Sequence, residues 1–540
     1  MARPDPLDHE DGLKPGRFGH APALWLALPM LAGCAADAAW DLPAGATLAV
    51  ATAALLLLWP LFTRVTTAHI LMATAGVSVG AAWHQLRKAP RSAAPVTRSY
   101  QELSVRIERA AQREAVDAGW TGTGVVTDRD GAYHRRRLAI SARGPCPPAG
   151  AELRLAGRLA SLAGDDGAYA AWARGQGATL RMTGARTLGT LETASAFQAW
   201  CAARRAHLDR WLRTLPWEDS VGGSLLAATM LGRTGLIPAE ERRAFARTGT
   251  LHLFAISGLH IAGMAAAMEW AARRLRLPGL AAGLAGLALL WAYVQVTGAA
   301  PSAPRAWIMA ACLWAGRALG RGVSPAQSLG CACFITLVLD PEACTDAGFQ
   351  LSYLAVLGLL LSGGPAARTL GGPTAEETAS PPSARGRLQR AASTVRRAVI
   401  SGLCVSFSAS VAGGPLCLAI FGYASWGGVF ANLLLVPLSA PPLLLGMASA
   451  MASVWEPALP TATWINGAAA TWLRTMCWLA ERMAELPGLT AEIDGLPAWS
   501  GPLWAAMLLA ALLSQAEARD PWRLLASPLA AAAVWLALVT

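Results

Sequence analysis

Two histidines and a serine lie within an apolar stretch near the middle of the chain. His252, Ser257 and His260 belong to the sequence HLFAISGLHIAGM, which is otherwise apolar enough to enter a bilayer. Ionisable side chains at such a depth usually face a bundle interior or a water-filled path. On one continuous helix the two histidines would be about 80° apart, and Ser257 would share their side. The pattern predicts either contacts that hold helices together or a surface that touches a transported molecule.

Polar side chains also interrupt the apolar runs that follow. Arg305 opens one run, and Asp346 stands at the start of another, where a carboxylate suits the helix dipole. Single residues of this kind usually serve packing, but together they suggest a polar lumen. We expect eight residues to line it: His252, Ser257, His260, Arg305, Asp346, Gln350, Ser352 and Asn432.

The composition predicts the elements that must position these residues. The 540 residues are 54% hydrophobic and only 15% charged, and several apolar runs reach the roughly 20 residues that span a bilayer. We therefore expect a polytopic α-helical membrane protein with a small extracytoplasmic β-rich, OB-like domain inserted after the first spans. The expected parts are a disordered cytoplasmic tail (1–20), N-terminal transmembrane helices (21–86), the β-domain (87–199), amphipathic interfacial helices (200–248), a transmembrane domain (249–454) and C-terminal transmembrane helices (455–540).

The polar segment after the first spans has the pattern of a small β-domain. Residues 100–117 look helical and polar, and Asp130-Gly131 is a hairpin signal between two of the β-type runs that follow. These runs cover residues 120–127, 133–142, 152–160 and 178–187. The pattern predicts a barrel or a sandwich.

This β-domain is rich in arginine. Positions 98 to 213 hold 18 arginines against 11 acidic residues. Tyr133, Arg135, Arg136 and Arg137 form a basic and aromatic cluster beside the expected hairpin, as a surface that follows a nucleic-acid backbone requires. A solvated strand rich in arginine has the same sequence pattern, so both interpretations stay open.

Cysteine spacing predicts no metal site, because zinc needs more ligands close together than any C-x-C pair here offers. Cys146 and Cys201 both fall in the long polar segment. If that segment is extracytoplasmic, the two can form a disulfide, provided that they lie close together in space.

Arginine in the short loops predicts the orientation. Loops expected inside, such as 273–276 and 364–397, are rich in arginine, whereas 299–304, 341–346 and 422–427 hold none. This asymmetry follows the positive-inside rule. It requires the β-domain to lie outside the cytoplasm.

Four ordered blocks carry a resemblance to a known family. They are residues 231–264, TGAAPSAPRAW at 297–307, DAGFQLSYLAVLGLLL at 346–361 and FGYASWGGVFANLLLVPL at 421–438. In order and spacing they resemble the membrane domain of the ComEC family of competence proteins. The resemblance implies an inner-membrane channel, not an enzyme, that admits one strand of external DNA to the cytoplasm during natural transformation, with an OB-like outer domain.

The resemblance also implies partners. We expect single-stranded DNA, an extracytoplasmic DNA receptor and the lipid bilayer, with the pore formed by one chain or a homo-oligomer. The chain has no P-loop sequence, which predicts a separate cytoplasmic ATP-driven motor. It also lacks the H-x-H motif of the metallo-β-lactamase-like domain found in many relatives, which predicts a separate nuclease. No cofactor is expected. The alternative function is a membrane-embedded enzyme or small-solute transporter that uses the 252–260 histidine motif.

Overall fold

The computed structural model describes most of the chain. The described residues are 22–40, 76–85, 99–112, 119–128, 133–162, 173, 178–256, 258–299, 302–320, 323–371, 384–453, 455–486, 490–493, 496–497, 500–514 and 520–539. The expected tail (1–20), residues 41–75 of the expected N-terminal transmembrane helices (21–86) and Ser257 lie outside them.

The first described helix, α1 (Pro22–Trp40), packs against a helical segment at residues 76–85. Gly33 makes this approach possible, since a Cβ there would overlap the backbone carbonyl of Val77. The buried side chains of Asp37 and His84 meet across the pair, with Oδ2 and Nδ1 2.7 Å apart. A polar contact of this kind stabilises two helices in an apolar environment.

A closed five-stranded barrel follows. Its strands are β1 (Ser99–Gln112), β2 (Trp120–Val126), β3 (Arg137–Ala142), β4 (Glu152–Ser161) and β5 (Leu180–Glu192), in the order β1-β2-β3-β5-β4. Only β3 and β5 pair in parallel among these strands. Alternating side chains fill the interior, among them the fully buried Trp120, Ile140 and Leu155. The expected OB-like β-domain is confirmed.

The helix expected over residues 100–117 is wrong, because most of that segment is the strand β1. Leu103, Val105 and Ile107 are buried on alternate positions, and this period of two predicts a strand despite the many charged residues between them. The Asp130-Gly131 turn lies outside the described residues. β2 and β3 nevertheless pair antiparallel, as consecutive strands of a hairpin do.

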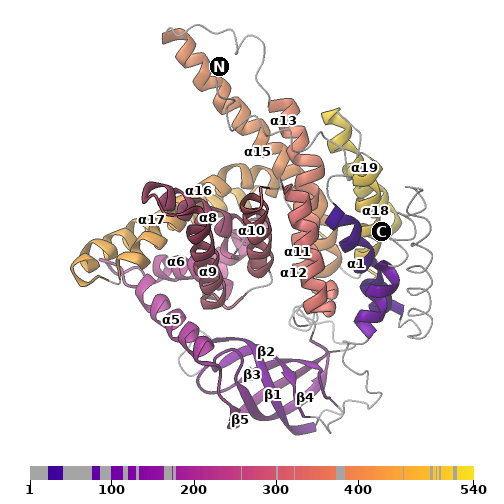
Figure 1. Cartoon of the computed structure of the whole chain (residues 1–540), viewed down its shortest axis with the longest axis vertical. Coiled ribbons are helices and arrows are strands. Elements are labelled where there is room, and N and C mark those ends of the chain that lie inside the picture. The colour runs from indigo at the N-terminus through magenta and orange to yellow at the C-terminus, as the bar shows by residue number, and fades with distance from the viewer. Residues whose placement is uncertain are drawn as a thin grey trace.

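Short helices join the barrel to the helical part of the chain. They are α5 (Ala196–Leu212), α6 (Ser220–Leu231), η2 (Thr234–Leu236), α7 (Ala239–Arg247) and η3 (Leu251–Phe254). Ser195 starts α5 with a reciprocal capping box to Gln198, so the chain leaves the barrel as a defined helix. Figure 1 shows α5 leading from the barrel to the helices above it.

The remaining elements form the helical domain. They are α8 (Gly258–Arg274), α9 (Gly279–Val296), α10 (Ser302–Ala318), α11 (Pro325–Leu339), η4 (Pro341–Thr345), α12 (Ala347–Gly358), η5 (Leu359–Gly363), α13 (Gly364–Gly371), α15 (Ala384–Phe421), β6 (Tyr423–Ser425), α16 (Gly428–Ala452), η6 (Glu456–Ala458), α17 (Leu459–Ala484), β7 (Thr490–Glu492), α18 (Ser500–Ser514) and α19 (Pro521–Val539). One core joins α6, α16 and α17, and another joins α1, α11, α12, α15, α18 and α19. Figure 1 shows these two groups on opposite sides of the domain.

Within the described residues, five helices are long and apolar enough to cross a membrane: Gly279–Val296, Ala347–Gly371, Ala391–Phe421, Gly428–Ala452 and Pro521–Val539. The surface of α9 exposes Leu280, Leu284 and Leu289 by more than half, as a lipid-facing helix does. The expected polytopic membrane fold, with the barrel ahead of these spans, is confirmed.

Ion pairs connect some of the loops and helix ends whose side of the membrane the arginines predict. Asp340, just before η4, contacts Arg137 of the barrel, so this turn lies at the barrel end. Glu269 of α8 pairs with Arg273 and with Arg317 of α10. The ends of α8 and α10, which lead into loops expected on the same side of the membrane, are therefore neighbours.

Candidate functional site

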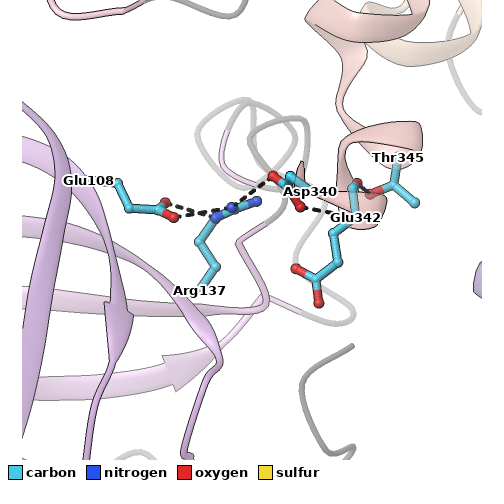
Figure 2. Close-up of polar contacts among 5 residues, drawn as sticks. All are labelled: Glu108, Arg137, Asp340, Glu342 and Thr345. Carbon is cyan, nitrogen blue, oxygen red and sulfur yellow. Dashed lines mark hydrogen bonds and ion pairs between the residues drawn. The ribbon is translucent and has the colours of Figure 1, made fainter. Parts of the chain in front are cut away.

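Arg137 links the barrel to the helical domain. Its Nε and Nη2 donate to Glu108 of β1 at 2.8 and 3.1 Å, and Nη2 also lies 3.4 Å from Asp340 Oδ2 (Figure 2). Burial lowers the pKa of Arg137, but the carboxylates of Glu108 and Asp340 outweigh it and raise that pKa above its usual range. Arg137 therefore stays charged and fastens the barrel to the α11–η4 turn.

The turn that receives Arg137 is fixed locally. Asp340 Oδ1 accepts the backbone N–H of Glu342, and Thr345 Oγ1 donates to the carbonyl of Glu342 (Figure 2). Pro341 occupies the first position of η4, where its missing N–H costs no hydrogen bond. The short element is thus preorganised to hold Asp340 toward the barrel.

A second barrel arginine faces the same end of the bundle. Arg109 of β1 interacts electrostatically with Asp346, Glu108, Arg137 and Asp340. Burial lowers the pKa of Arg109, and the carboxylates, Asp346 foremost, act against this change. The barrel therefore presents two arginines to an acidic rim formed by the residues that precede η4 and α12.

Arg305 of α10 lies buried behind this rim. Its Nη2 donates to the carbonyl of Gly348 at 2.8 Å, and its guanidinium lies 5.8 and 5.4 Å from the ring centres of Phe349 and Tyr353. Only 5% of the residue is exposed, and its Nε has no hydrogen-bond partner among the described residues. A buried guanidinium with a spare donor suits a site that receives an anionic group.

The start of α12 collects three of the expected site residues around Arg305. Asp346 caps this helix by accepting the N–H of Phe349 at 2.8 Å. Gln350 Nε2 donates to the carbonyl of Cys344 at 2.8 Å, and Ser352 lies half-buried two residues further along. The structure therefore brings Arg305, Asp346 and Gln350 together, although the order of the sequence blocks alone does not predict this.

The histidine motif is arranged differently from the single helix expected. His252 belongs to η3, which ends at Phe254, and His260 to α8, which begins at Gly258. His252 is exposed, with its Nδ1 3.1 Å from the carbonyl of Gly249, whereas His260 is buried. The 80° relation assumed for one helix is wrong, although the two rings lie close enough to interact electrostatically.

Asn432 lies in the first turns of α16. Its Oδ1 is buried and has no hydrogen-bond partner in the described part of the chain. Gly428, at the start of the same helix, lies beside Thr248 and Gly249, next to the histidine motif. Asn432 is thus on the element that packs against the 248–249 turn, not at the start of α12.

The four residues proposed to contact DNA have different surroundings. Tyr133 is 8% exposed and belongs to the barrel core, and Arg137 is held in the ion pairs described above. Arg135 is exposed, with a left-handed backbone (φ 61°), and Arg136 is half-buried. Of the four, Arg135 alone is exposed, so they do not form one continuous exposed patch.

Sequence reasoning missed a second group of exposed arginines. Arg154 and Arg158 alternate with buried residues along β4, and Arg186 of β5 is opposite Ala156 between them. Exposed Tyr100 of β1 is directly opposite Arg158. The period of two in β4 was visible in the sequence, but the pairing that brings the three strands together was not.

Cys146 and Cys201 are both free thiols, so the expected disulfide is absent from this structure. Cys146 packs at the edge of the barrel core near Arg205 and Arg233, whereas Cys201 is buried on α5, outside that core. The two sulfurs thus have different surroundings. Burial raises the pKa of each thiol.

The described residues contain no group of three His, Cys, Asp or Glu side chains placed to hold a metal ion. The polar atoms at the barrel–bundle junction are instead guanidiniums, carboxylates and backbone carbonyls. Guanidiniums can bind the phosphate oxygens of an anionic chain through hydrogen bonds, without forming a covalent bond.

Comparisons with known proteins identify the family. A family model described as Competence protein matches residues 229–518, more than half of the 540 residues. ComE operon protein 3 of Bacillus subtilis (strain 168) is 32% identical over 158 residues, which cover 29% of this chain and 20% of that protein. The matched region thus spans about a fifth of the relative's length, and no solved structure gives a significant match. The four sequence blocks, the helical domain and the family match together establish that this chain belongs to the competence protein family.

Proposed function

We propose that this protein is a channel in the cytoplasmic (inner) membrane that conducts single-stranded DNA into the cytoplasm during natural transformation. One observation carries the proposal: an arginine-rich barrel is fastened by Arg137 to the end of a membrane bundle where another arginine, Arg305, is buried beside Asp346. Membership of the competence protein family supports it. A strand that follows the barrel surface would reach the bundle at this junction.

In the proposed mechanism the barrel gathers the DNA. Exposed Arg135, Arg154, Arg158 and Arg186 neutralise phosphates and release their counterions, which favours binding with little dependence on sequence. Tyr100, 64% exposed, offers a ring on which a base can stack beside Arg158. The barrel then concentrates polyanion at the outer end of the bundle.

The helical domain then replaces the hydration of the strand. The proposed lining begins with Arg305, whose charge matches a phosphate, and continues with the polar side chains of α12. Further lining residues are proposed at the histidine motif and at the start of α16: His252, Ser257, His260 and Asn432. Polar groups in a bundle interior can substitute for water around a permeating ion.

The proposed channel works with other proteins. A receptor outside the cytoplasm would deliver DNA, a separate nuclease would remove the second strand, and a cytoplasmic ATP-driven motor would pull the conducted strand inward. The barrel would lie outside the cytoplasm, because the positive-inside rule places the arginine-rich loops, such as 273–276, on the cytoplasmic side. One chain or a homo-oligomer would form the pore.

A transport measurement in the host tests the proposal. We would delete the gene, restore it on a plasmid, and supply labelled double-stranded DNA. We expect the deletion to leave surface-bound label unchanged, to abolish nuclease-protected label in the cytoplasm, and to be reversed by the plasmid. If the deletion strain internalises as much label as the wild type, the channel function is refuted.

A further inference from the structure

Three arginines surround one aspartate where α5 meets the helical domain. Arg213 Nε lies 3.4 Å from Asp209 Oδ2, and Arg233 Nη1 lies 3.5 Å from Asp209 Oδ1. Arg205 interacts electrostatically with both Arg233 and Asp209. We name these four residues the Asp209 cluster. Three guanidiniums against one carboxylate leave two positive charges in excess within the cluster.

Arg205 is held in a position that is unfavourable for a cation. Its Nη2 donates to the carbonyl of Thr297 at 3.0 Å, and its Nε is buried with no hydrogen-bond partner among the described residues. Burial and then the neighbouring Arg233 lower its pKa to about 10. An unsatisfied buried donor costs about 1–3 kcal/mol, more when it is charged, so such an arrangement is typical of a site with a missing partner.

The backbone beside Arg205 leaves space for its guanidinium. Gly298 has a left-handed conformation (φ +90°), and a Cβ there would lie 2.7 Å from Arg205 Nη1. Glycine therefore serves two needs at this position, since it adopts the positive φ and permits the close approach. The α9–α10 connection that begins here leads directly to Arg305.

The cluster lies between the barrel and the bundle. Cys146, in the barrel loop after β3, is among the groups that interact electrostatically with Arg205. Thr297 and Gly298 belong to the α9–α10 connection of the bundle. A ligand at the cluster must be anionic and must present several acceptor oxygens, as a phosphate group does. The position between barrel and bundle favours the phosphate of a strand that passes from one to the other over that of a lipid.

We infer that the Asp209 cluster binds a backbone phosphate of the DNA strand as the strand passes from the barrel to the helical domain. The inference rests on the proposed function and adds a binding site to it. Arg205 Nε supplies the donor that lacks a partner, and the excess charge of the cluster is matched by the phosphate. Asp209 competes with the phosphate while it positions Arg213 and Arg233.

The test measures the binding of a labelled single-stranded oligonucleotide to the full chain in nanodiscs of uncharged lipid, at increasing NaCl. Loss of one phosphate contact should lower the slope of log K against log salt by about 0.7. We expect Arg205→Gln and Arg213→Gln each to weaken binding several-fold with this change of slope, and Arg205→Lys to recover part of the loss. Arg317→Gln, at the opposite end of α10 from Arg305 and 75% exposed, is the control.

Asp209→Asn distinguishes the inference from simple misfolding. Removing the competing carboxylate should tighten DNA binding, whereas a damaged fold would weaken it. Wild-type affinity and slope in Arg205→Gln would overturn the inference and leave the proposed function standing. A wild-type chain that binds no DNA would overturn both. If nanodiscs of phosphatidylglycerol raise the melting temperature of the wild type but not of Arg205→Gln, while DNA affinity is equal, the phosphate belongs to a lipid and the inference is wrong.

Discussion

Replacing Arg137 by glutamine should loosen the contact between barrel and bundle. Ion pairs at exposed surfaces contribute about 0.2–1 kcal/mol, and breaking a buried pair costs about 3–5 kcal/mol. The side chains of Arg137 and Glu108 are 17% and 34% exposed, but that of Asp340 is 44% exposed, so solvent screens part of the interaction. We expect a loss of about 1–2 kcal/mol, a factor of roughly 5 to 30 in the docking equilibrium.

Hydrogen exchange measures this equilibrium in the intact protein. In nanodiscs, Arg137→Gln should speed amide exchange at η4 and along β3 by the same factor of roughly 5 to 30, because both elements lose a shared constraint. Arg154→Gln, on the outer face of β4, is the matched control and should leave both elements unchanged. Exchange at η4 within twofold of wild type in Arg137→Gln would refute the role of Arg137 as the link.

A double-mutant cycle isolates the pair itself. If Arg137 acts through Asp340, Asp340→Asn should speed exchange less than Arg137→Gln, since Glu108 still holds the arginine. The double variant should then cost less than the sum of the two single changes. Additive costs would show that the two side chains act independently.

Two further predictions concern the thiols and the buried arginine. Mass spectrometry after alkylation of the denatured, unreduced protein should find both Cys146 and Cys201 alkylated, and a disulfide between them would contradict this. In the native protein, Cys146 should react slowly at neutral pH and faster as the pH rises, because its raised pKa keeps the thiol protonated until higher pH. Arg305→Gln should lower the melting temperature, which tryptophan fluorescence can follow. The substitution removes the hydrogen bond to Gly348 and a buried ring contact, which together stabilise the fold by about 2–3 kcal/mol. An unchanged melting temperature would show that these contacts are not stabilising.

The sequence was sufficient for the barrel except at its first strand. Four of the five strands follow from β-type runs, and the apolar spans follow from composition. The composition of β1 predicts a polar helix instead, because the strand contains Glu102, Arg106 and Glu108. The alternation of Leu103 and Val105 was the signal that the composition obscured.

The junction was harder to predict, because its partners are distant in sequence. Arg137 and Asp340 are 203 residues apart, and nothing in either local pattern links them. The sequence alone therefore groups Arg137 with Arg135 as a DNA contact, although in the fold Arg137 fixes the position of the barrel. Likewise the break between η3 and α8 separates His252 from His260, because Gly258 begins a new helix within an apolar run that reads as continuous.

Photo-crosslinking during DNA uptake tests the central claim that a strand passes through the bundle. A photoreactive side chain would replace Ser352, half-buried on α12, or Leu284, which is 54% exposed on the apolar helix α9. In cells that are internalising labelled DNA, we predict crosslinks to the label at position 352 and none at position 284. Normal internalisation with crosslinks at 284 alone, or at neither position, would contradict a path through these helices.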